Sequence, residues 1–296
     1  MKKKLVVYFL AFILIISFAF ADSLLAEDNF LWRLSGPEGN FYLLGSFHYM
    51  PADSYPLDDV IYDSLEKSDI LAVEIDITEI DEFELQQYIM EEGILGENRE
   101  LKNKISADIY EEVIDIGKQY GIPEENMNDF APWYASQTIA GFALEEIGME
   151  AAEGVDIHLI DKAKEMEKEI FELETMLDQL DYLAEMELDL QRAVLRDTVE
   201  ELDYDLSRVK DAVTAWETGE VEPVREFLFE RRDKSPEMEE YYAIMFDERE
   251  VKMRDGILSL LEDDKKPFVV VGSGHVINDA GLLHLFDEMD YEIEQL

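Results

Sequence analysis

Two histidines occupy the same short pattern near opposite ends of the chain. Residues 45–48 and 272–275 both read Gly-Ser-x-His, and they contain two of the four histidines, His48 and His275. Each pattern directly follows a run of apolar residues, which predicts a buried strand that ends in a tight turn containing glycine. In open α/β sheets, ligands bind at the carboxyl ends of the strands. We therefore expect the two histidines to belong to one site.

Acidic side chains in other predicted strands are candidates to complete this site. Glu74 and Asp76 lie two residues apart in the apolar run 69–77, and Glu172 and Glu174 have the same spacing in a later run, so each pair shares one strand face. A carboxylate buried in such a run is normally neutralised, paired or metal-bound. Two histidines and one glutamate are a known ligand set for a catalytic divalent metal, which activates a bound water. The ligands expected from this pattern are His48, Glu74 and His275.

The remaining histidines and the two motif serines have simpler explanations. His158 lies on a predicted helix and is expected to be structural, although Asp156 on the same turn could face the site. His284 lies between two leucines and is expected to pack in the interior. Ser46 and Ser273 lack the Gly-x-Ser-x-Gly pattern of a nucleophilic serine. The chain also has no His-Glu-x-x-His zinc motif.

The order of predicted elements indicates an α/β fold. Extended runs are predicted at residues 29–34, 40–44, 69–77, 169–174 and 267–271. A helix over 56–67 joins the first hairpin to the next strand, which makes a βαβ unit. Helical patterns dominate about 78–150 and 175–263. We predict a single domain over 22–296, with a central mixed, mostly parallel sheet, long helical insertions and the two Gly-x-x-His turns at carboxyl ends of strands.

The first 21 residues have the features of a secretory signal peptide. Three lysines precede an apolar stretch that ends in Ala-Phe-Ala before Asp22. The apolar stretch is also close to the shortest bilayer span, about 17 residues, so an uncleaved N-terminal anchor is the alternative. In either case we expect the rest of the chain to be secreted, periplasmic or on the outer face of the cell membrane. Membrane association is expected only through this segment.

The chain carries an extreme negative charge. It has 25 lysines and arginines against 71 aspartates and glutamates, a net charge of −46 that becomes −49 without the three lysines of the signal segment. Such a field repels nucleic acid, which excludes a nucleic-acid partner. We interpret the charge as adaptation to a salty medium, and a solvated acidic face is the alternative. The sequence contains no cysteine, so there is no disulfide framework.

Six short motifs, taken in order, resemble those of the TraB/GumN family. They lie at residues 43–48, 73–76, 154–156, 173–179, 215–219 and 271–275. The family includes bacterial pheromone-shutdown proteins and the animal Tiki proteins, and it is related to the erythromycin esterase and ChaN-like group. The resemblance covers residues 30–291, and it implies an α/β fold in which two Gly-x-x-His motifs meet at a divalent-metal site. For Tiki-like members it also implies metalloprotease activity, with manganese or cobalt favoured over zinc.

The resemblance also assigns roles to individual residues. The motif histidines and Glu74 match the family's metal-site positions. Asp156 and Glu174 match further acidic positions of the family, and one of the two would act as ligand or base. Arg249 resembles the arginine of an Arg-Asn pair and would hold a carboxylate or the substrate. Glu250 stands where the asparagine of that pair is usual, so any role of the asparagine is in doubt.

These observations predict an exported divalent-metal-dependent hydrolase, a Tiki-like metallopeptidase that acts on a peptide or small protein. A non-catalytic protein that sequesters a peptide signal, or a haem or metal ligand, is the alternative. A structural protein with incidental turn histidines is a third interpretation. In the first, the metal ligands are His48, Glu74 and His275, and the other site residues are Glu174, Asp156 and Arg249.

The charge interpretation predicts that the 22–296 chain is more stable in molar salt than in dilute buffer. Screening shortens the Debye length from about 10 Å at 0.1 M to about 3 Å at 1 M salt and so weakens repulsion between surface carboxylates. Thermal unfolding at both salt concentrations measures the effect. Equal melting temperatures would contradict the interpretation.

Overall fold

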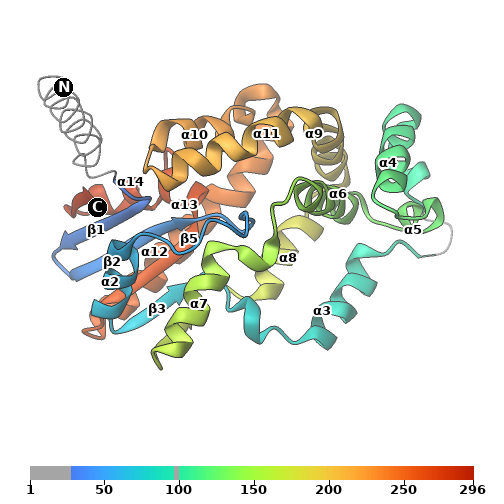
Figure 1. Cartoon of the computed structure of the whole chain (residues 1–296). Coiled ribbons are helices and arrows are strands. Elements are labelled where there is room, and N and C mark those ends of the chain that lie inside the picture. The colour runs from blue at the N-terminus through green and yellow to red at the C-terminus, as the bar shows by residue number, and fades with distance from the viewer. Residues whose placement is uncertain (1–27, 97–99) are drawn as a thin grey trace, which may run out of the picture.

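Six strands form one mixed sheet in the computed structural model, which describes residues 28–96 and 100–296 (Figure 1). The strands are β1 (Leu31–Gly36), β2 (Gly39–Ser46), β3 (Ile70–Val73), β4 (Glu169–Glu172), β5 (Pro267–Gly272) and β6 (Glu292–Gln295). Their order across the sheet is β4-β3-β5-β2-β1-β6. The four neighbouring strands β4, β3, β5 and β2 are parallel, whereas β1 is antiparallel to β2 and β6. The predicted α/β fold with a mixed, mostly parallel sheet is confirmed.

Helices make up most of the remaining described chain. They are α2 (Asp59–Lys67), α3 (Glu82–Tyr88), α4 (Ala107–Gln119), α5 (Glu124–Asn128), α6 (Pro132–Glu146), α7 (Val155–Glu165), α8 (Met176–Ala184), α9 (Leu188–Glu217), α10 (Val221–Phe229), α11 (Pro236–Tyr242), α12 (Glu248–Glu262), α13 (Ser273–Ile277) and α14 (Leu282–Asp287). Single 3-10 or π turns are η1 (Ile77–Glu79), η2 (Ile89–Gly93), η3 (Leu101–Asn103), η4 (Ala151–Glu153), η5 (Arg232–Lys234) and η6 (Ala243–Asp247). Figure 1 shows α3, α4 and α5 extending away from the sheet.

The predicted signal segment and the predicted single domain are not tested by the structure. The expected signal segment, residues 1–21, lies outside the described residues. Between residues 28 and 296, apart from 97–99, no helix is long and apolar enough to cross a membrane. The single domain over 22–296 stays a prediction.

The pairing of β2 with β5 brings the two Gly-Ser-x-His motifs together. The parallel register places Gly45 opposite Val271 and Ser46 opposite Gly272. Both motifs therefore leave the sheet side by side, at the carboxyl ends of adjacent strands. On the other side of β5, Val73 of β3 lies opposite Val270, which places the end of β3 at the same edge.

Complete burial explains the apolar character of the central strands. All of β3 and nearly all of β5 are buried, with α12 packed on β5 and α7 packed on β3 and β4. Parallel strands covered on both faces have continuous apolar runs instead of alternation, as these two do. The core of the sheet is thus a fixed support for the loops at its carboxyl edge.

Helix α9 connects this core to a second apolar cluster. Its 30 residues span about 45 Å. Leu195 and Leu202, in its first half, pack with buried residues of α4, α5 and α6, whereas Val213 and Trp216, at its end, belong to the core of the sheet. The long helix therefore holds the helical region in a defined position relative to the sheet.

Trp216 attaches the end of α9 to the end of β2. Its indole Nε1 donates a hydrogen bond of 2.6 Å to the Gly45 carbonyl oxygen, and the side chain is buried. The rings of Phe30 and Phe47 lie 6.5 and 6.4 Å from the Trp216 ring. This contact fixes the backbone three residues before His48.

Four local predictions were wrong. The strand predicted over 69–77 ends at Val73, because the Asp76 side chain accepts a hydrogen bond from the backbone N–H of Thr78 and begins η1. Glu74 and Asp76 therefore follow the strand and do not share one of its faces.

The second motif forms α13 instead of a turn. His284, predicted to pack inside, has a 49% exposed side chain 3.6 Å from Glu288, because the buried stripe of its short helix consists of Leu282 and Phe286.

The strand predicted over 169–174 also ends early, at Glu172. Its two acids do not share a face of a continuous strand. Glu172 accepts a hydrogen bond of 2.8 Å from the backbone N–H of Asp76, whereas Glu174 lies buried beyond the end of β4. Backbone hydrogen bonds continue past the end of β4, where the N–H of Leu173 donates to the Val73 carbonyl oxygen and the N–H of Glu174 donates to the Glu74 carbonyl oxygen. This pairing keeps the two glutamates next to each other.

We expect Trp216→Phe to lower the free energy of unfolding by about 1–3 kcal/mol, because a buried carbonyl loses its indole donor. Chemical denaturation of both proteins measures the change. Tyr204→Phe is the matched control, since Tyr204 is a 47% exposed aromatic residue on the same helix and its loss of a hydroxyl is expected to change stability by less than about 0.5 kcal/mol. Equal effects of the two substitutions would contradict the role given to Trp216.

Candidate functional site

The carboxyl edge of the sheet gathers the side chains expected to form the site. His48 follows β2, Glu74 follows β3, Glu174 follows β4, and His275 lies in the first turn of α13 directly after β5. The four parallel strands thus each contribute one residue. The adjacency of the two histidine motifs, on which the predicted site depends, follows from the strand order.

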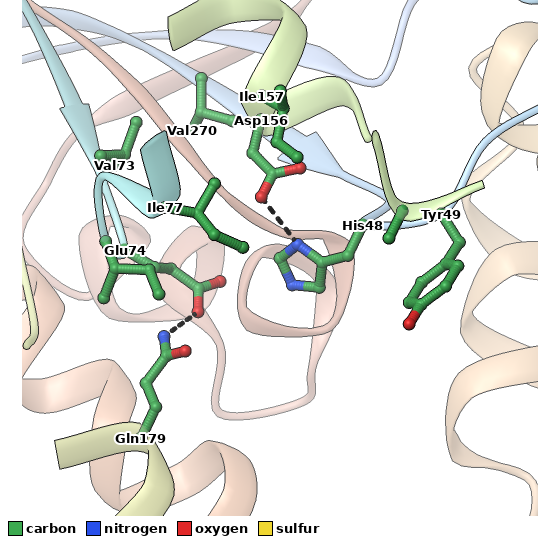
Figure 2. A pocket seen from close by; sticks show the side chains of 11 residues that line it. His48, Tyr49, Val73, Glu74, Ile77, Asp156, Ile157, Gln179 and Val270 are labelled. Carbon is green, nitrogen blue, oxygen red and sulfur yellow. Dashed lines mark hydrogen bonds and ion pairs between the residues drawn. The ribbon is translucent and has the colours of Figure 1, made fainter. Parts of the chain in front are cut away.

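The first histidine is paired with an aspartate from α7. His48 Nδ1 lies 3.0 Å from Asp156 Oδ2, and Figure 2 shows the His48 ring between the carboxylates of Asp156 and Glu74. The backbone N–H of Val155 donates a 3.0 Å hydrogen bond to the Phe47 carbonyl oxygen, which holds the start of α7 against the motif. A side chain at Gly154 would lie 2.7 Å from the His48 carbonyl oxygen, so only glycine permits this close approach.

The pairing sets the charge of His48. Loss of hydration by itself would lower the pKa of His48, but the carboxylates of Asp156 and Glu74 outweigh it and raise the pKa to about 9. The two carboxylates therefore favour the protonated form of His48, and a metal bound at its Nε2 would have to displace that proton. Its side chain is still 55% exposed, so the ring is accessible from a cavity.

Every oxygen of the Glu74 carboxylate is held by a donor. Oε1 accepts a 2.6 Å hydrogen bond from the Gly272 backbone N–H, and Oε2 accepts 2.8 Å hydrogen bonds from Gln179 and Arg249. Desolvation by itself would raise the pKa of Glu74, but the positive charges of His275, Arg249 and His48 lower it to about 2. Glu74 is a fixed, buried anion.

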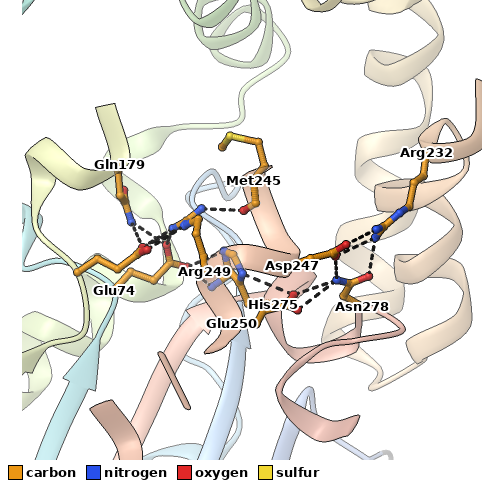
Figure 3. Close-up of polar contacts among 11 residues, drawn as sticks. Glu74, Gln179, Arg232, Met245, Asp247, Arg249, Glu250, His275 and Asn278 are labelled. Atoms are coloured by element: carbon orange, nitrogen blue, oxygen red, sulfur yellow. Dashed lines mark hydrogen bonds and ion pairs between the residues drawn. The ribbon is translucent and has the colours of Figure 1, made fainter. Parts of the chain in front are cut away.

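Arg249 on α12 joins two buried carboxylates (Figure 3). Its Nε lies 3.0 and 3.1 Å from the two oxygens of Glu174, its NH2 group lies 2.6 Å from Glu174 and 2.8 Å from Glu74, and its NH1 group donates to the Met245 carbonyl oxygen. The three side chains of this ion cluster are 6%, 1% and 8% exposed for Arg249, Glu174 and Glu74. Desolvation opposes the charge on Arg249, but both carboxylates raise its pKa. All three guanidinium nitrogens therefore donate hydrogen bonds inside the protein.

The second histidine lies between two glutamates without a hydrogen bond to either. His275 Nε2 is 3.9 Å from Glu74 Oε1, and its Nδ1 is 3.8 Å from Glu250 Oε1. His275 is buried, and its Nδ1 has no hydrogen-bond partner among the described residues. The Phe246 ring packs 5.1 Å from the imidazole ring. The ring is therefore held by packing, with a carboxylate beyond each nitrogen.

A polar network behind His275 was not predicted from the sequence. Glu250 is completely buried and accepts hydrogen bonds of 3.0 and 3.3 Å from Asn278. Asn278 also donates to Asp247, and Arg232 donates to both Asn278 and Asp247, as Figure 3 shows. The acid that stands in place of the family's asparagine is thus paired with an amide from the second motif's helix end.

A helical pattern in the sequence would have revealed this buried acid. Position 250 falls on the same helix stripe as the buried residues Met253 and Ile257, three and seven residues later. A glutamate in an apolar stripe requires a polar partner. The partner itself, Asn278, is 28 residues away and could not be identified from spacing.

Gly272 marks the point where the candidate ligands converge. A methyl group at its Cα would lie 3.2 Å from Glu74 Oε1, 3.5 Å from His48 Nε2 and 3.8 Å from His275 Cδ2. Both imidazoles thus present their Nε2 side towards the same carboxylate oxygen. In this arrangement, however, no three His, Asp or Glu side chains among the described residues form a group positioned to hold a metal ion.

The other residues considered from the sequence do not join this group. His158 Nε2 lies 2.9 Å from the Tyr62 hydroxyl oxygen, and its ring stacks on Tyr55. Ser273 donates a hydrogen bond of 3.1 Å to the Ser46 carbonyl oxygen, and the Ser46 hydroxyl is buried without a hydrogen-bond partner in the described structure. Neither serine is hydrogen-bonded to a histidine.

The fold and site define an α/β protein in which two histidines and an arginine-bound glutamate meet at the carboxyl edge of a mostly parallel sheet. The chain belongs to the TraB/PrgY/GumN family, whose model matches residues 30–295. This match confirms the family resemblance of the six motifs.

Two curated relatives match part of the chain. A protein called YbaP of Escherichia coli K12, described as uncharacterized, is 25% identical over 160 residues, which cover 54% of this chain and 57% of YbaP. YbaP of Shigella flexneri is 25% identical over 158 residues, covering 53% of this chain and 56% of that protein. The chain therefore spans a little over half the length of the curated relatives it matches. No solved structure matches it.

We expect Arg249→Met to lower the free energy of unfolding by about 3–5 kcal/mol, because it leaves two buried carboxylates without their shared cation. Adding Glu174→Gln to this variant is expected to restore part of the loss by removing one of the two charges. Chemical denaturation measures all three proteins.

Arg254→Met is the matched control for this prediction. Arg254 lies on the same helix and pairs with Asp255, whose side chain is 61% exposed, so its removal is expected to cost less than about 1 kcal/mol. A loss for Arg249→Met no larger than this would show that the ion cluster does not stabilise the fold.

Proposed function

We propose that this protein is an exported divalent-metal-dependent hydrolase, a peptidase that acts on a peptide or small protein. In this proposal His48, Glu74 and His275 hold the metal. The observation that carries it is the arrangement around the two imidazoles. Both present Nε2 towards Glu74 Oε1, and each has a separate carboxylate beside its Nδ1, Asp156 or Glu250.

The side-chain types at the site, two imidazoles and a carboxylate, are those that bind divalent metals, but their positions in this structure do not form a metal-binding group among the described residues. Histidine ligands usually donate their second ring N–H to a carboxylate, which fixes the tautomer and aims the other nitrogen at the metal. Asp156 has this position for His48 at 3.0 Å, whereas Glu250 lies beside the Nδ1 atom of His275 at 3.8 Å without a hydrogen bond. Imidazole and carboxylate ligands together suit manganese and cobalt as well as zinc, and the family resemblance favours manganese or cobalt.

The bound metal would supply a water of lowered pKa and a Lewis acid for the scissile carbonyl group. The protein's own residues do the positioning. Asp156 Oδ2 holds the Nδ1 proton of His48, and Arg249 holds the Glu74 carboxylate in place and keeps it charged. The oxygens of Glu174 are bound to Arg249, with Gln179 as a further donor, so we assign Glu174 to orienting Arg249.

A non-catalytic peptide-binding protein is the second candidate. It is favoured by the internal hydrogen bonds of the site, because Glu74 and Glu174 are both engaged with Arg249 and Gln179. Such a protein would bind peptide and leave it intact. Mass spectrometry of a peptide library incubated with the metal-loaded protein separates the two candidates, since only a peptidase produces cleaved peptides.

We expect manganese or cobalt to raise the melting temperature of the 22–296 chain, and EDTA to reverse the change. Metal at one hundred times its dissociation constant stabilises the folded state by about 2.7 kcal/mol. The His48→Ala/His275→Ala double variant is expected to show no metal-dependent shift. Thermal unfolding with manganese, cobalt, zinc and EDTA measures the effect.

His284→Ala is the control for the double variant. His284 is half exposed, and the only ion pair it forms with the described residues is with Glu288, so its removal is expected to leave the metal shift unchanged. An identical shift in the wild-type protein and the double variant would place any bound metal elsewhere. No shift with any of the three metals would remove the metal from the proposal.

A further inference from the structure

Three cavities lie in a row across the candidate site. Cavity A, of about 200 Å³, and cavity B, of about 390 Å³, share His48, Glu74 and Gln179 in their linings. Cavity C, of about 430 Å³, shares Gln137, Leu228 and Tyr241 with cavity B. Cavities B and C are each within the size range of ligand sites. His48 and Glu74 thus lie between two cavities and not at the end of one.

Cavity B has an apolar wall opposite the histidines. Its residues come from α8, α10, α11 and η6, and they include Leu180, Leu183, Leu228, Tyr241 and Met245. All five are only half-buried in the folded chain. A buried apolar group of a ligand would gain about 25 cal/mol for each Å² removed from water here. The wall is therefore suited to a bulky apolar group.

The charged groups of these cavities are already paired. Arg249 in cavity B is bound to two carboxylates, and Arg231 in cavity C lies 2.8 Å from Asp197 and 2.7 Å from Asp205. No arginine or lysine that lines B or C is left over to receive an anionic group, within the part of the chain described. The linings consequently favour an uncharged ligand over a fatty acid or a phosphate ester.

Two primary amides line the places where the cavities meet. Gln179, between A and B, donates its Nε2 protons to Glu74 and Glu174 and has no partner for its carbonyl oxygen in the described residues. Gln137, between B and C, is exposed on α6. Side-chain amides can donate to and accept from a peptide backbone. An extended peptide could meet both while it crosses the site.

We propose that the site takes an uncharged segment of an extended peptide, with a bulky apolar side chain in cavities B and C and the neighbouring residue in cavity A. The proposal rests on the proposed function for the cleavage of this peptide, but its binding does not require the metal. Cavities A and B lie on the two sides of His48 and Glu74. A ligand that fills both must extend in both directions from the bond held there, as a peptide does on either side of an interior peptide bond. A fatty acid has its reacting group at one end.

The test uses peptide binding in EDTA, so that a failure of the metal proposal leaves the result unaffected. The probes are two end-blocked dansyl hexapeptides, Gly-Gly-Phe-Leu-Gly-Gly and Gly-Gly-Ser-Ser-Gly-Gly, and dansyl-undecanoate. Fluorescence titration of the 22–296 protein measures each affinity. We expect the apolar peptide to bind at least about tenfold more tightly than the serine peptide, and more tightly than the fatty acid.

Leu228→Trp narrows the passage between B and C and is expected to weaken binding of the apolar peptide by about tenfold. Leu183→Trp fills cavity B alone and is also expected to weaken binding of the apolar peptide. It replaces the first variant in the test if Leu228→Trp does not fold. Val251→Trp is the control, because Val251 is 43% exposed on α12 and lines none of the three cavities. It is expected to leave the affinity within about twofold.

The opposite results would overturn the proposal. Equal affinities for the two peptides would show that the apolar wall does not select the ligand. Tighter binding of dansyl-undecanoate would assign the cavities to an acyl chain. Unchanged peptide binding in folded Leu228→Trp and Leu183→Trp proteins would place the peptide elsewhere.

Discussion

The parallel pairing of β2 with β5 is the constraint on which the site depends. It joins a strand near the start of the described chain to one near its end, with Ser46 opposite Gly272. A shift of one residue would turn the side chains of a strand to its other face. Buried apolar residues on both strands and the hydrogen bond from Trp216 to Gly45 oppose such a shift. The two histidine motifs therefore leave the sheet at one place.

The cluster of Glu74, Glu174 and Arg249 imposes the second condition. Burying these three charges is unfavourable unless they remain together, so α12 must dock where its arginine reaches the ends of β3 and β4. The same docking places Glu250 beside His275. Helix α12 thus orients the Glu74 carboxylate through Arg249 and places Glu250 next to His275. The position of these side chains is a consequence of neutralising buried charge.

The acidic composition supplies partners for the basic residues that follow α10. Arg231, Arg232 and Lys234 each pair with aspartates or glutamates that lie far from them in sequence. Local neutralisation leaves cavity linings in which the charged side chains are paired and the other residues are mostly apolar, inside a chain of net charge −46. The surface can therefore carry a strong negative electrostatic field while the cavities stay nearly neutral. The opposite charges in the cavity linings lie a few ångströms apart, so their electrostatic fields cancel.

The sequence by itself determined the α/β class, the two motif histidines at strand ends and the burial of Glu74, because apolar runs and turn glycines are local signals. The tertiary structure decided what depends on distant parts of the chain. It inserted β5 between β2 and β3, paired Arg249 with a glutamate 175 residues away, and matched Glu250 with Asn278. It also ended β3 at Val73. Strand order and the partners of buried charges are set by packing between elements, which no local pattern specifies.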